Sequence, residues 1–305
     1  MFQIDFTASR LSAFGDVTVK APMSKFTTFK TGGEADVLVA PLGYEAAAEI
    51  LKYCRAECVP LTVIGAGSNL LVSDRGIRGV VMRISRDVMK NPRLELLSCG
   101  RVFSDAAVMK QDFIDFAITN NLGNVEFMAG IPGAVGGGII MNAGTFMGNF
   151  IDILDEITYI DHAGEFKTIK CSKSLAHYRG IDLPDAVVIC SARFNLPAAD
   201  GAELKKRIDD IISDRKKKHP WEYPSAGSVF KNPEGHFAWK LVNDAGLKGY
   251  CIGGAQVSEL HTNFIINKGG ATSGDIRNLI VHVQESVNSR NGVSLHTEVR
   301  MMGEF

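Results

Sequence analysis

The chain has 305 residues, with 33 Lys and Arg against 34 Asp and Glu, and 46% of its residues are apolar. This composition is typical of globular proteins and excludes a disordered chain, which would be less apolar and less balanced in charge. The near-zero net charge argues against a dedicated nucleic-acid-binding protein, because such a protein carries a basic face. The length predicts two or three domains.

The cysteines and the N-terminus indicate a cellular compartment. Only Cys54 and Cys58 lie close together in the sequence, and no CxxC pair occurs, so we expect reduced thiols of the kind found in cytosolic proteins. Asp5 lies where a signal peptide would be apolar. No apolar run approaches the roughly 18–20 residues of a membrane span. We therefore expect a cytoplasmic protein without nucleic-acid or membrane partners.

The first two thirds of the chain alternate between strand and helix patterns. Apolar β-type runs predict strands over 36–40, 61–65 and 79–84, and an Ala- and Glu-rich segment predicts a helix over 44–57. A second helix is predicted from Ser104, as N-cap, to Asn120. After a glycine-rich stretch, further strands are expected over 157–161 and 186–196.

The pattern changes near residue 200, where a turn leads into a charged helix, and we predict a domain boundary close to Ala202. A later amphipathic helix, followed by Gly292, is predicted from apolar residues at the i, i+3, i+4, i+7 spacing: Ile276, Leu279, Ile280, Val283 and Val287. The segment SLHTEVRMMG (294–303) predicts a final strand. These elements together favour an α+β protein.

Two glycine-rich segments are candidates for an anion-binding site. GAGSNLL (65–71) follows a predicted strand, and GIPGAVGGG (130–138) precedes MNAG (141–144). Glycine lets backbone N–H groups converge on a diphosphate without Cβ clashes. The first segment lacks the third glycine of a Rossmann fingerprint, and the absence of any Gly-Lys dipeptide excludes a Walker A loop. Tight turns packed against a sheet are the alternative interpretation.

Several long motifs extend beyond these loops: TTFKTGGEADVLVAP (27–41), IGAGSNLLVSDRGIRGVV (64–81), GIPGAVGGGIIMNAG (130–144), HYRG (177–180), PSAGSVFKNP (224–233), GLKGYCIGGAQVSELHTNFIIN (246–267) and LHTEVR (295–300). In these motifs and their order, the sequence resembles the UDP-N-acetylenolpyruvoylglucosamine reductase (MurB) family of bacterial peptidoglycan synthesis. The resemblance implies an FAD-binding module of the vanillyl-alcohol-oxidase (PCMH) type, with α+β subdomains over 1–84 and 85–201. A C-terminal α+β substrate-binding domain would follow over 202–305. The chain is similar to the shorter members of the family, which lack a tyrosine-bearing loop.

The implied reaction has two halves. NADPH reduces noncovalently bound FAD, and hydride then passes to C3 of the enolpyruvyl group, which yields UDP-N-acetylmuramate after protonation of C2. Hydride addition at C3 leaves negative charge at C2 and on the neighbouring carboxylate, so the site needs a proton donor and a carboxylate-binding group. The resemblance assigns these roles to Ser228 as proton donor, Arg179 as the carboxylate-binding cation and Glu298 as a protonated carboxyl. Relatives often have a serine at the position of Ile181, two residues after this arginine.

The resemblance also implies binding residues. The cofactor-binding residues would be Gly65, Ala66, Gly67, Ser68, Asn69, Leu70, Gly130, Ile131, Pro132, Gly133, Gly136, Gly137, Asn142 and Ala143. The residues in contact with the UDP-sugar substrate would be Tyr178, Arg215, Lys218, Lys231, Asn232, Gln256, His261 and Asn263. Arg215 and Lys218 belong to a basic run that a solvated helix end would also explain.

Two alternative functions differ in what they require. An FAD-dependent oxidase or dehydrogenase of the same fold would act on another substrate, and a nucleotide-binding protein without activity would retain only the glycine loops. The serine motif and Glu298 favour the reductase, because oxidases of this fold need neither. We expect the reductase to be a monomer.

Overall fold

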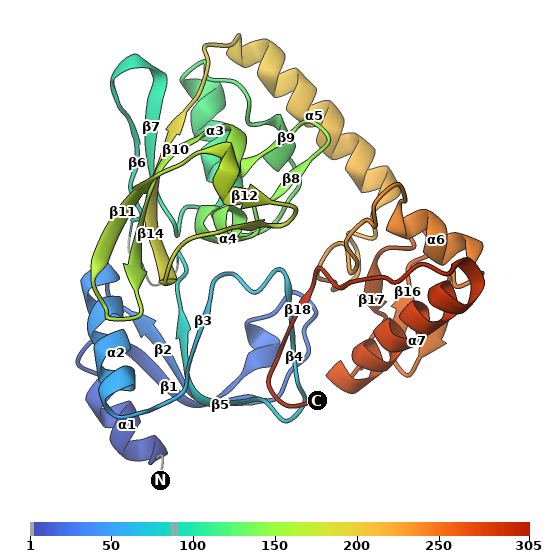
Figure 1. Cartoon of the computed structure of the whole chain (residues 1–305), viewed down its shortest axis with the longest axis horizontal. Helices are drawn as coiled ribbons and strands as arrows, with labels where there is room; N and C mark the ends of the chain where they lie inside the picture. The colour runs from blue at the N-terminus through green and yellow to red at the C-terminus, as the bar shows by residue number, and fades with distance from the viewer. Residues whose placement is uncertain (1–2, 87–88, 90) are drawn as a thin grey trace. The chain divides into compact units, whose positions relative to one another are not determined.

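The computed structural model describes residues 3–86, 89 and 91–305 (Figure 1). The helices are α1 (Ile4–Leu11), α2 (Tyr44–Ala56), α3 (Lys110–Thr119), α4 (Val135–Ile140), α5 (Gly201–Lys218), α6 (Ala238–Asp244) and α7 (Ser273–Asn291). The strands are β1 (Gly15–Pro22), β2 (Glu34–Pro41), β3 (Leu61–Ile64), β4 (Leu70–Val72), β5 (Ile77–Arg83), β6 (Leu94–Leu96), β7 (Arg101–Asp105), β8 (Gly144–Thr145), β9 (Gly148–Asn149), β10 (Leu154–Asp161), β11 (Phe166–Lys170), β12 (Ala176–His177), β13 (Gly180–Ile181), β14 (Ala186–Asn195), β15 (Cys251–Ile252), β16 (Ala255–Val257), β17 (Ile265–Asn267) and β18 (Arg300–Met302).

The chain divides into two compact units, each built from separate segments. Unit 1 comprises Met1–Val19, Val37–Ala66 and Gly79–Asp214. Unit 2 comprises Lys20–Asp36, Gly67–Arg78 and Arg215–Phe305. The division into domains over 1–84, 85–201 and 202–305 stays a prediction.

The predicted strands and helix of the first third are confirmed. They form β2, β3, β5 and α2, and the strands belong to a four-stranded sheet of order β1-β2-β5-β3. β3 and β5 run parallel, with Leu61 opposite Val80. Helices α1 and α2 pack beside this sheet through the fully buried Leu11 and Ile50 (Figure 1). The sheet thereby fixes the point at which the chain leaves β3 and enters the first glycine segment.

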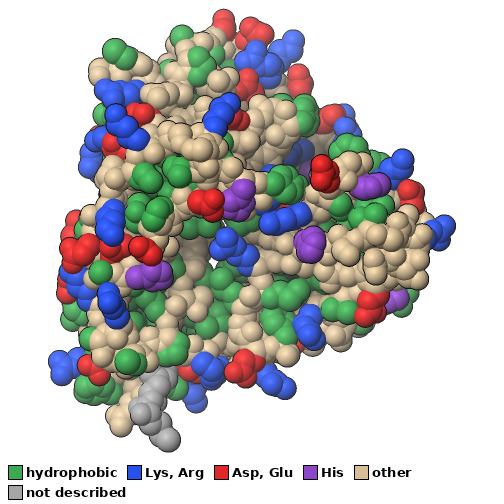
Figure 2. All heavy atoms as spheres, in the orientation of Figure 1, with side chains coloured by type: hydrophobic (Ala, Val, Ile, Leu, Met, Phe, Trp, Pro, Cys, Tyr) green, Lys and Arg blue, Asp and Glu red, His purple; other side chains and the backbone are tan. Residues whose placement is uncertain are grey.

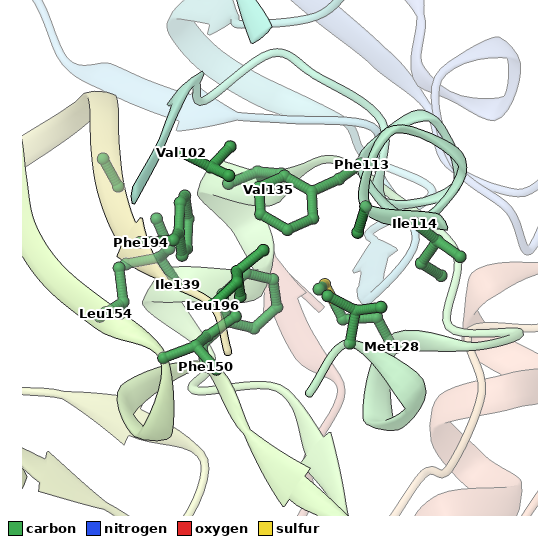
Figure 3. Close-up of a cluster of buried hydrophobic side chains, with 14 of the residues drawn as sticks. Val102, Phe113, Ile114, Met128, Val135, Ile139, Phe150, Leu154, Phe194 and Leu196 are labelled. Atoms are coloured by element: carbon green, nitrogen blue, oxygen red, sulfur yellow. The ribbon is translucent and has the colours of Figure 1, made fainter. Parts of the chain in front are cut away.

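A second, five-stranded sheet carries the larger core of unit 1. Its strand order is β11-β10-β14-β7-β6, and all its pairings are antiparallel. Three buried aromatic rings lie in its core, with Phe194 in edge contact with Phe113 at 4.9 Å and with Phe150 at 6.3 Å between centroids (Figure 3). Phe150 follows the second glycine segment, so this core anchors the end of that segment.

Two predictions of element boundaries are wrong. Ser104 does not cap a helix: it is fully buried in β7, opposite Ala192 of β14 on one side and Leu94 of β6 on the other. Its backbone lies in the ladder of a central strand, and the helix α3 begins only at Lys110, after Met109. The final strand is also shorter than 294–303, since only Arg300–Met302 form β18, which pairs parallel to β4.

Unit 2 has its own core around α7. The predicted apolar stripe of this helix is buried, and Gly292 ends it with a φ of 67°, which confirms the predicted cap. The core also takes Phe29 and Leu71 from two earlier segments of the chain. The Asp74 carboxylate accepts hydrogen bonds of 2.8 Å from the backbone N–H groups of Ser273 and Gly274, and so caps the first turn of α7.

The surface carries both signs of charge. Figure 2 shows Lys and Arg side chains interspersed with Asp and Glu over the face in view. Throughout residues 3–86, 89 and 91–305, the structure has no helix of the length and apolarity that crossing a bilayer requires.

Candidate functional site

The first glycine segment combines a position that only glycine can occupy with a more open one. Gly67 has a φ of 70°, and a Cβ there would lie 1.9 Å from the carbonyl oxygen of Phe26. At Gly65 the nearest atom to such a Cβ is the Ile84 oxygen, at 3.8 Å. Gly65 and Ala66 belong to unit 1, whereas Gly67 and the following Ser68, Asn69 and Leu70 belong to unit 2.

The second glycine segment contains the short helix α4, which has one packed face and one open face. A Cβ on Gly136 would lie 2.7 Å from the Cβ of Ala106, and one on Gly138 would lie 2.4 Å from the Phe150 ring. Gly137, on the exposed side, has no atom within 4 Å of the same position among the described residues. Bare backbone is therefore presented to open space at Gly137, as a diphosphate-binding surface requires.

The residues before and after α4 shape the same surface. Gly130 and Gly133 have φ values of 70° and 101°, which Cβ-bearing residues rarely adopt. Asn142 is buried, and its Oδ1 accepts a 3.0 Å hydrogen bond from Ile151 N. Its Nδ2 donates to the carbonyl oxygen of His177 at 3.5 Å. Asn142 thus connects the second glycine segment to the hairpin that carries the predicted catalytic arginine.

Arg179 lies at the tip of that hairpin. β12 and β13 pair with His177 opposite Gly180, which leaves Tyr178 and Arg179 as a two-residue turn. The Arg179 guanidinium carbon is 4.8 Å from the centroid of the Tyr178 ring, a cation–π distance. Arg179 has a φ of 63°, a backbone conformation that costs free energy for any residue other than glycine and that is often found at functional sites.

Ser228 and Glu298 lie on neighbouring extended segments of unit 2. Val229 N donates to the Asn263 oxygen at 2.8 Å, and Val229 O accepts from Glu298 N at 2.7 Å. Val229, Phe230 and Val299 are buried in the core of unit 2. Ser228 and Glu298, which directly precede Val229 and Val299, are both half-buried, and the Val229–Glu298 hydrogen bond holds their segments side by side.

The first glycine segment is hydrogen-bonded to the Glu298 segment through Asn69. Asn69 Nδ2 donates to the Glu298 carbonyl oxygen at 3.0 Å, and Asn69 O accepts from Arg300 N at 3.0 Å. Unit 2 therefore brings a predicted cofactor-binding residue, the predicted proton donor segment and the predicted catalytic carboxyl into one hydrogen-bonded group. Sequence analysis did not anticipate this connection, which joins residues more than two hundred positions apart.

Three predicted substrate-binding amides are engaged with backbone groups. Asn263 accepts from Phe230 N at 3.0 Å and donates to Phe230 O at 2.9 Å, so it positions the serine motif. Gln256 donates to Gly249 O, and Asn232 accepts from Ala238 N. Lys231 continues the serine motif, and its N–H donates to His296 O at 2.9 Å. Substrate contact by these residues stays a prediction.

The end of α5 carries a half-buried cation without an acidic partner. Burial lowers the pKa of the Arg215 guanidinium, and no carboxylate of the described residues lies within 4.0 Å of it. His219, which the sequence analysis did not single out, lies one helical turn after Arg215, and its backbone N–H donates to Arg215 O at 2.8 Å. Its ring centroid is 5.2 Å from that of His261 and 4.9 Å from that of Phe264. Its place directly after a basic run and before Pro220 was the available sequence signal.

Comparison with known proteins identifies this arrangement. A family model described as "FAD binding domain" matches residues 35–170, and one described as "UDP-N-acetylenolpyruvoylglucosamine reductase, C-terminal domain" matches 219–302. The reductase of Listeria monocytogenes serotype 4a is 41% identical over 291 residues, which cover 94% of this chain and 95% of that protein. The reductase of Clostridium perfringens strain SM101 is 42% identical over 289 residues, covering 94% and 93%.

A solved structure agrees with these relatives. The crystal structure of UDP-N-acetylenolpyruvylglucosamine reductase (MurB) from Thermus caldophilus is 30% identical, with a TM-score of 0.79, and the match covers 95% of this chain and 99% of that one. The fold and site define an FAD-dependent oxidoreductase, with an FAD-binding module followed by a C-terminal α+β domain. The chain belongs to the UDP-N-acetylenolpyruvoylglucosamine reductase family. The open backbone at Gly137 and the room at Gly65 fit the diphosphate of FAD.

Proposed function

We propose that this enzyme reduces UDP-N-acetylenolpyruvoylglucosamine to UDP-N-acetylmuramate, with NADPH as the source of electrons. Bound FAD would supply the redox chemistry, taking hydride from NADPH and delivering it to C3 of the enolpyruvyl group. The observation that carries the proposal is the hydrogen bonding of Val229 to both Asn263 and Glu298, since it holds the Ser228 segment beside the Glu298 segment.

Ser228 would deliver the proton to C2. A serine hydroxyl is a very weak acid, so it can protonate only a strongly basic carbon, and C2 becomes one as hydride reaches C3. Glu298, on the segment hydrogen-bonded to Val229, would donate a hydrogen bond from a protonated carboxyl to the developing enolate. Arg179 would bind the substrate carboxylate through its planar, two-pronged guanidinium.

The remaining predicted residues would bind the rest of the substrate and the cofactor. Arg215 and Lys218 would neutralise the diphosphate of the UDP moiety, and Tyr178, Lys231, Asn232, Gln256, His261 and Asn263 would complete the substrate site. FAD would bind noncovalently on the two glycine segments. We further propose a monomeric enzyme of the cytoplasm, which the six free thiols support because reduced cysteines are typical of that compartment.

The half-reactions of Ser228→Ala test the mechanism. In stopped-flow absorbance, flavin reduction by NADPH should stay within about twofold of wild type, while reoxidation by substrate should slow by about 10²–10⁴-fold, the usual contribution of a general acid. Ser225→Ala, in the same motif, is the matched control and should leave both rates nearly unchanged. An equal loss of both half-reactions in Ser228→Ala would contradict the proton-donor role.

A further inference from the structure

Four groups that are cationic or can become cationic gather at the start of the C-terminal segment of unit 2. Arg215 and Lys218 come from the end of α5, His219 follows them, and His261 comes from the loop before β17. The two imidazole rings meet edge to face at 5.2 Å. Both also contact the ring of Phe264, each at 4.9 Å between centroids. Phe264 in turn pairs with Ser228 through an antiparallel bridge, so the cluster adjoins the serine motif.

Without a ligand, this cluster disfavours a charge on either imidazole. Burial, followed by the charges of His261, Arg215 and Lys218, lowers the pKa of His219 to about 4. Burial also lowers the pKa of His261, and so does the charge of Arg215, although a hydrogen bond to its own backbone acts in the opposite direction. Among the described residues, Arg215 and Lys218 are the permanently charged groups that act on His219, and Arg215 also acts on His261.

The two histidines differ in their freedom to accept a proton. His261 Nδ1 accepts a 3.3 Å hydrogen bond from Asn263 N, an arrangement that favours the neutral tautomer with the proton on Nε2. Protonation of His261 would therefore leave that N–H without its acceptor, next to the residue that holds the serine motif. Protonation of His219 breaks no such bond, since no N–H group of the described residues donates to its ring. His219 is thus the imidazole that can change its charge without disturbing the site.

We propose that His219 is a proton-coupled anion sensor of the substrate site, neutral in the free enzyme and protonated by solvent when a nucleoside diphosphate ester binds beside Arg215. The inference rests on the proposed function, which places the UDP diphosphate at this end of α5. Two negative charges offset the repulsion from Arg215 and Lys218 and stabilise the imidazolium. The unpartnered guanidinium of Arg215 provides the fixed charge, and His219 adds a second cation only while the ligand is present.

Calorimetric titration of the FAD-loaded enzyme with UDP-N-acetylglucosamine tests this directly. The diphosphate diester of this ligand keeps its charge between pH 5.5 and 8, so any proton uptake belongs to the protein. Titrations in buffers of different ionisation enthalpy should show proton uptake, and the Kd should fall as the pH falls, by at most about tenfold per pH unit for one proton. Binding without proton uptake would overturn the proposal.

Variants assign the proton to its residue. His219→Gln retains a polar side chain that cannot be protonated, and it should abolish the uptake and flatten the pH dependence of Kd. His162→Gln, which replaces an exposed histidine of unit 1, is the matched control and should keep both. Arg215→Gln should weaken binding at every pH. Undiminished uptake in His219→Gln, or unchanged affinity in Arg215→Gln, would contradict the assignment.

Two further results separate this inference from the proposed function. An enzyme that turns over the enolpyruvyl substrate but does not bind UDP-N-acetylglucosamine would overturn the inference and leave the function standing. An enzyme that binds UDP-N-acetylglucosamine with proton uptake but does not reduce the enolpyruvyl substrate would overturn the proposed function and leave the anion-sensing role of His219 standing. If His219→Gln does not fold, as judged by its flavin spectrum, imidazole NMR of the wild-type enzyme gives the answer. The His219 resonance should titrate at a higher pH with the ligand than without it.

Discussion

Arg179 combines a strained backbone with a charge that the proposed reaction requires. The turn places a positive φ at its second residue, a position that favours glycine because a Cβ is poorly tolerated there. The next residue, Gly180, is also restricted to glycine. A Cβ at this position would lie 2.0 Å from the His177 ring. The hairpin thus keeps arginine at a position where glycine would be more stable, which is consistent with the role proposed for the guanidinium.

Arg179→Gly should therefore separate stability from activity. We expect the free energy of unfolding to stay the same or rise by about 1 kcal/mol, because the positive φ costs glycine nothing. Reoxidation of the reduced enzyme by substrate should slow by about 10²–10³-fold, as when a charge-stabilising donor is removed. Chemical denaturation and stopped-flow absorbance give the two quantities. Arg179→Lys retains the charge without the planar fork and should be intermediate in activity, whereas unchanged turnover in Arg179→Gly would exclude a role for this side chain.

At the scale of an element, the helix α4 lies in a segment that the sequence analysis described only as a glycine-rich loop. Glycine is unfavourable inside a helix, so propensity alone argues against one at residues 135–140. Close approach outweighs this cost here, because Gly136 packs on Ala106 and Gly138 on the Phe150 ring. A pattern of three successive glycines does not reveal which of them face the core, since the packing partners lie elsewhere in the chain.

Alanine substitutions on the two faces of α4 should have opposite effects. Gly138→Ala forces a Cβ against a fully buried ring, and we expect the FAD-free protein to lose about 1–3 kcal/mol of stability. Gly137→Ala meets no neighbour and should gain about 0.5–1 kcal/mol from helix propensity. The same methyl group would occupy the surface proposed for the cofactor, so the affinity for FAD should fall. Thermal unfolding of the FAD-free protein and fluorescence titration with FAD measure the two effects, and a Gly137→Ala variant with normal FAD affinity would argue against that surface.

For the whole molecule, the sequence predicted local features and missed the long-range ones. The apolar spacing of α7 and the cap at Gly292 were predicted, because periodicity and a glycine stop are local signals. Ser104 was misassigned because a serine beside an apolar run looks the same in a helix cap and in a central strand. The motifs around Ser228 and Glu298 led to the prediction that both residues are catalytic, but they did not reveal the connection of the two segments through Val229 and Asn69. Such contacts depend on how distant segments meet, which no short sequence pattern records.

Unit 2 is built from three separate segments of the chain, so we predict that its C-terminal segment does not fold alone. A fragment of residues 202–305 would contain α7 and the serine motif, but it would lack several partners that the structure supplies from earlier segments. Phe29 and Leu71 are fully buried in its core, and β18 would lose its pairing with β4. The first turn of α7 would lose the Asp74 cap.

These losses should remove most of the stability available to the fragment. Each of the two buried side chains contributes about 1.5–3 kcal/mol and the cap about 1 kcal/mol, and together these are comparable with the lower part of the roughly 5–15 kcal/mol of a small domain, before the lost strand pairing is counted. We therefore expect residues 202–305 alone to give a poorly dispersed amide NMR spectrum and no cooperative thermal transition, while the full chain gives both. Leu71→Ala in the full chain should lower its stability by about 2–5 kcal/mol, which checks one of these contributions separately. A well-dispersed, cooperatively melting fragment would show that the C-terminal segment folds without the two earlier segments, and the contacts of Phe29, Leu71 and Asp74 would then be accessory to its core.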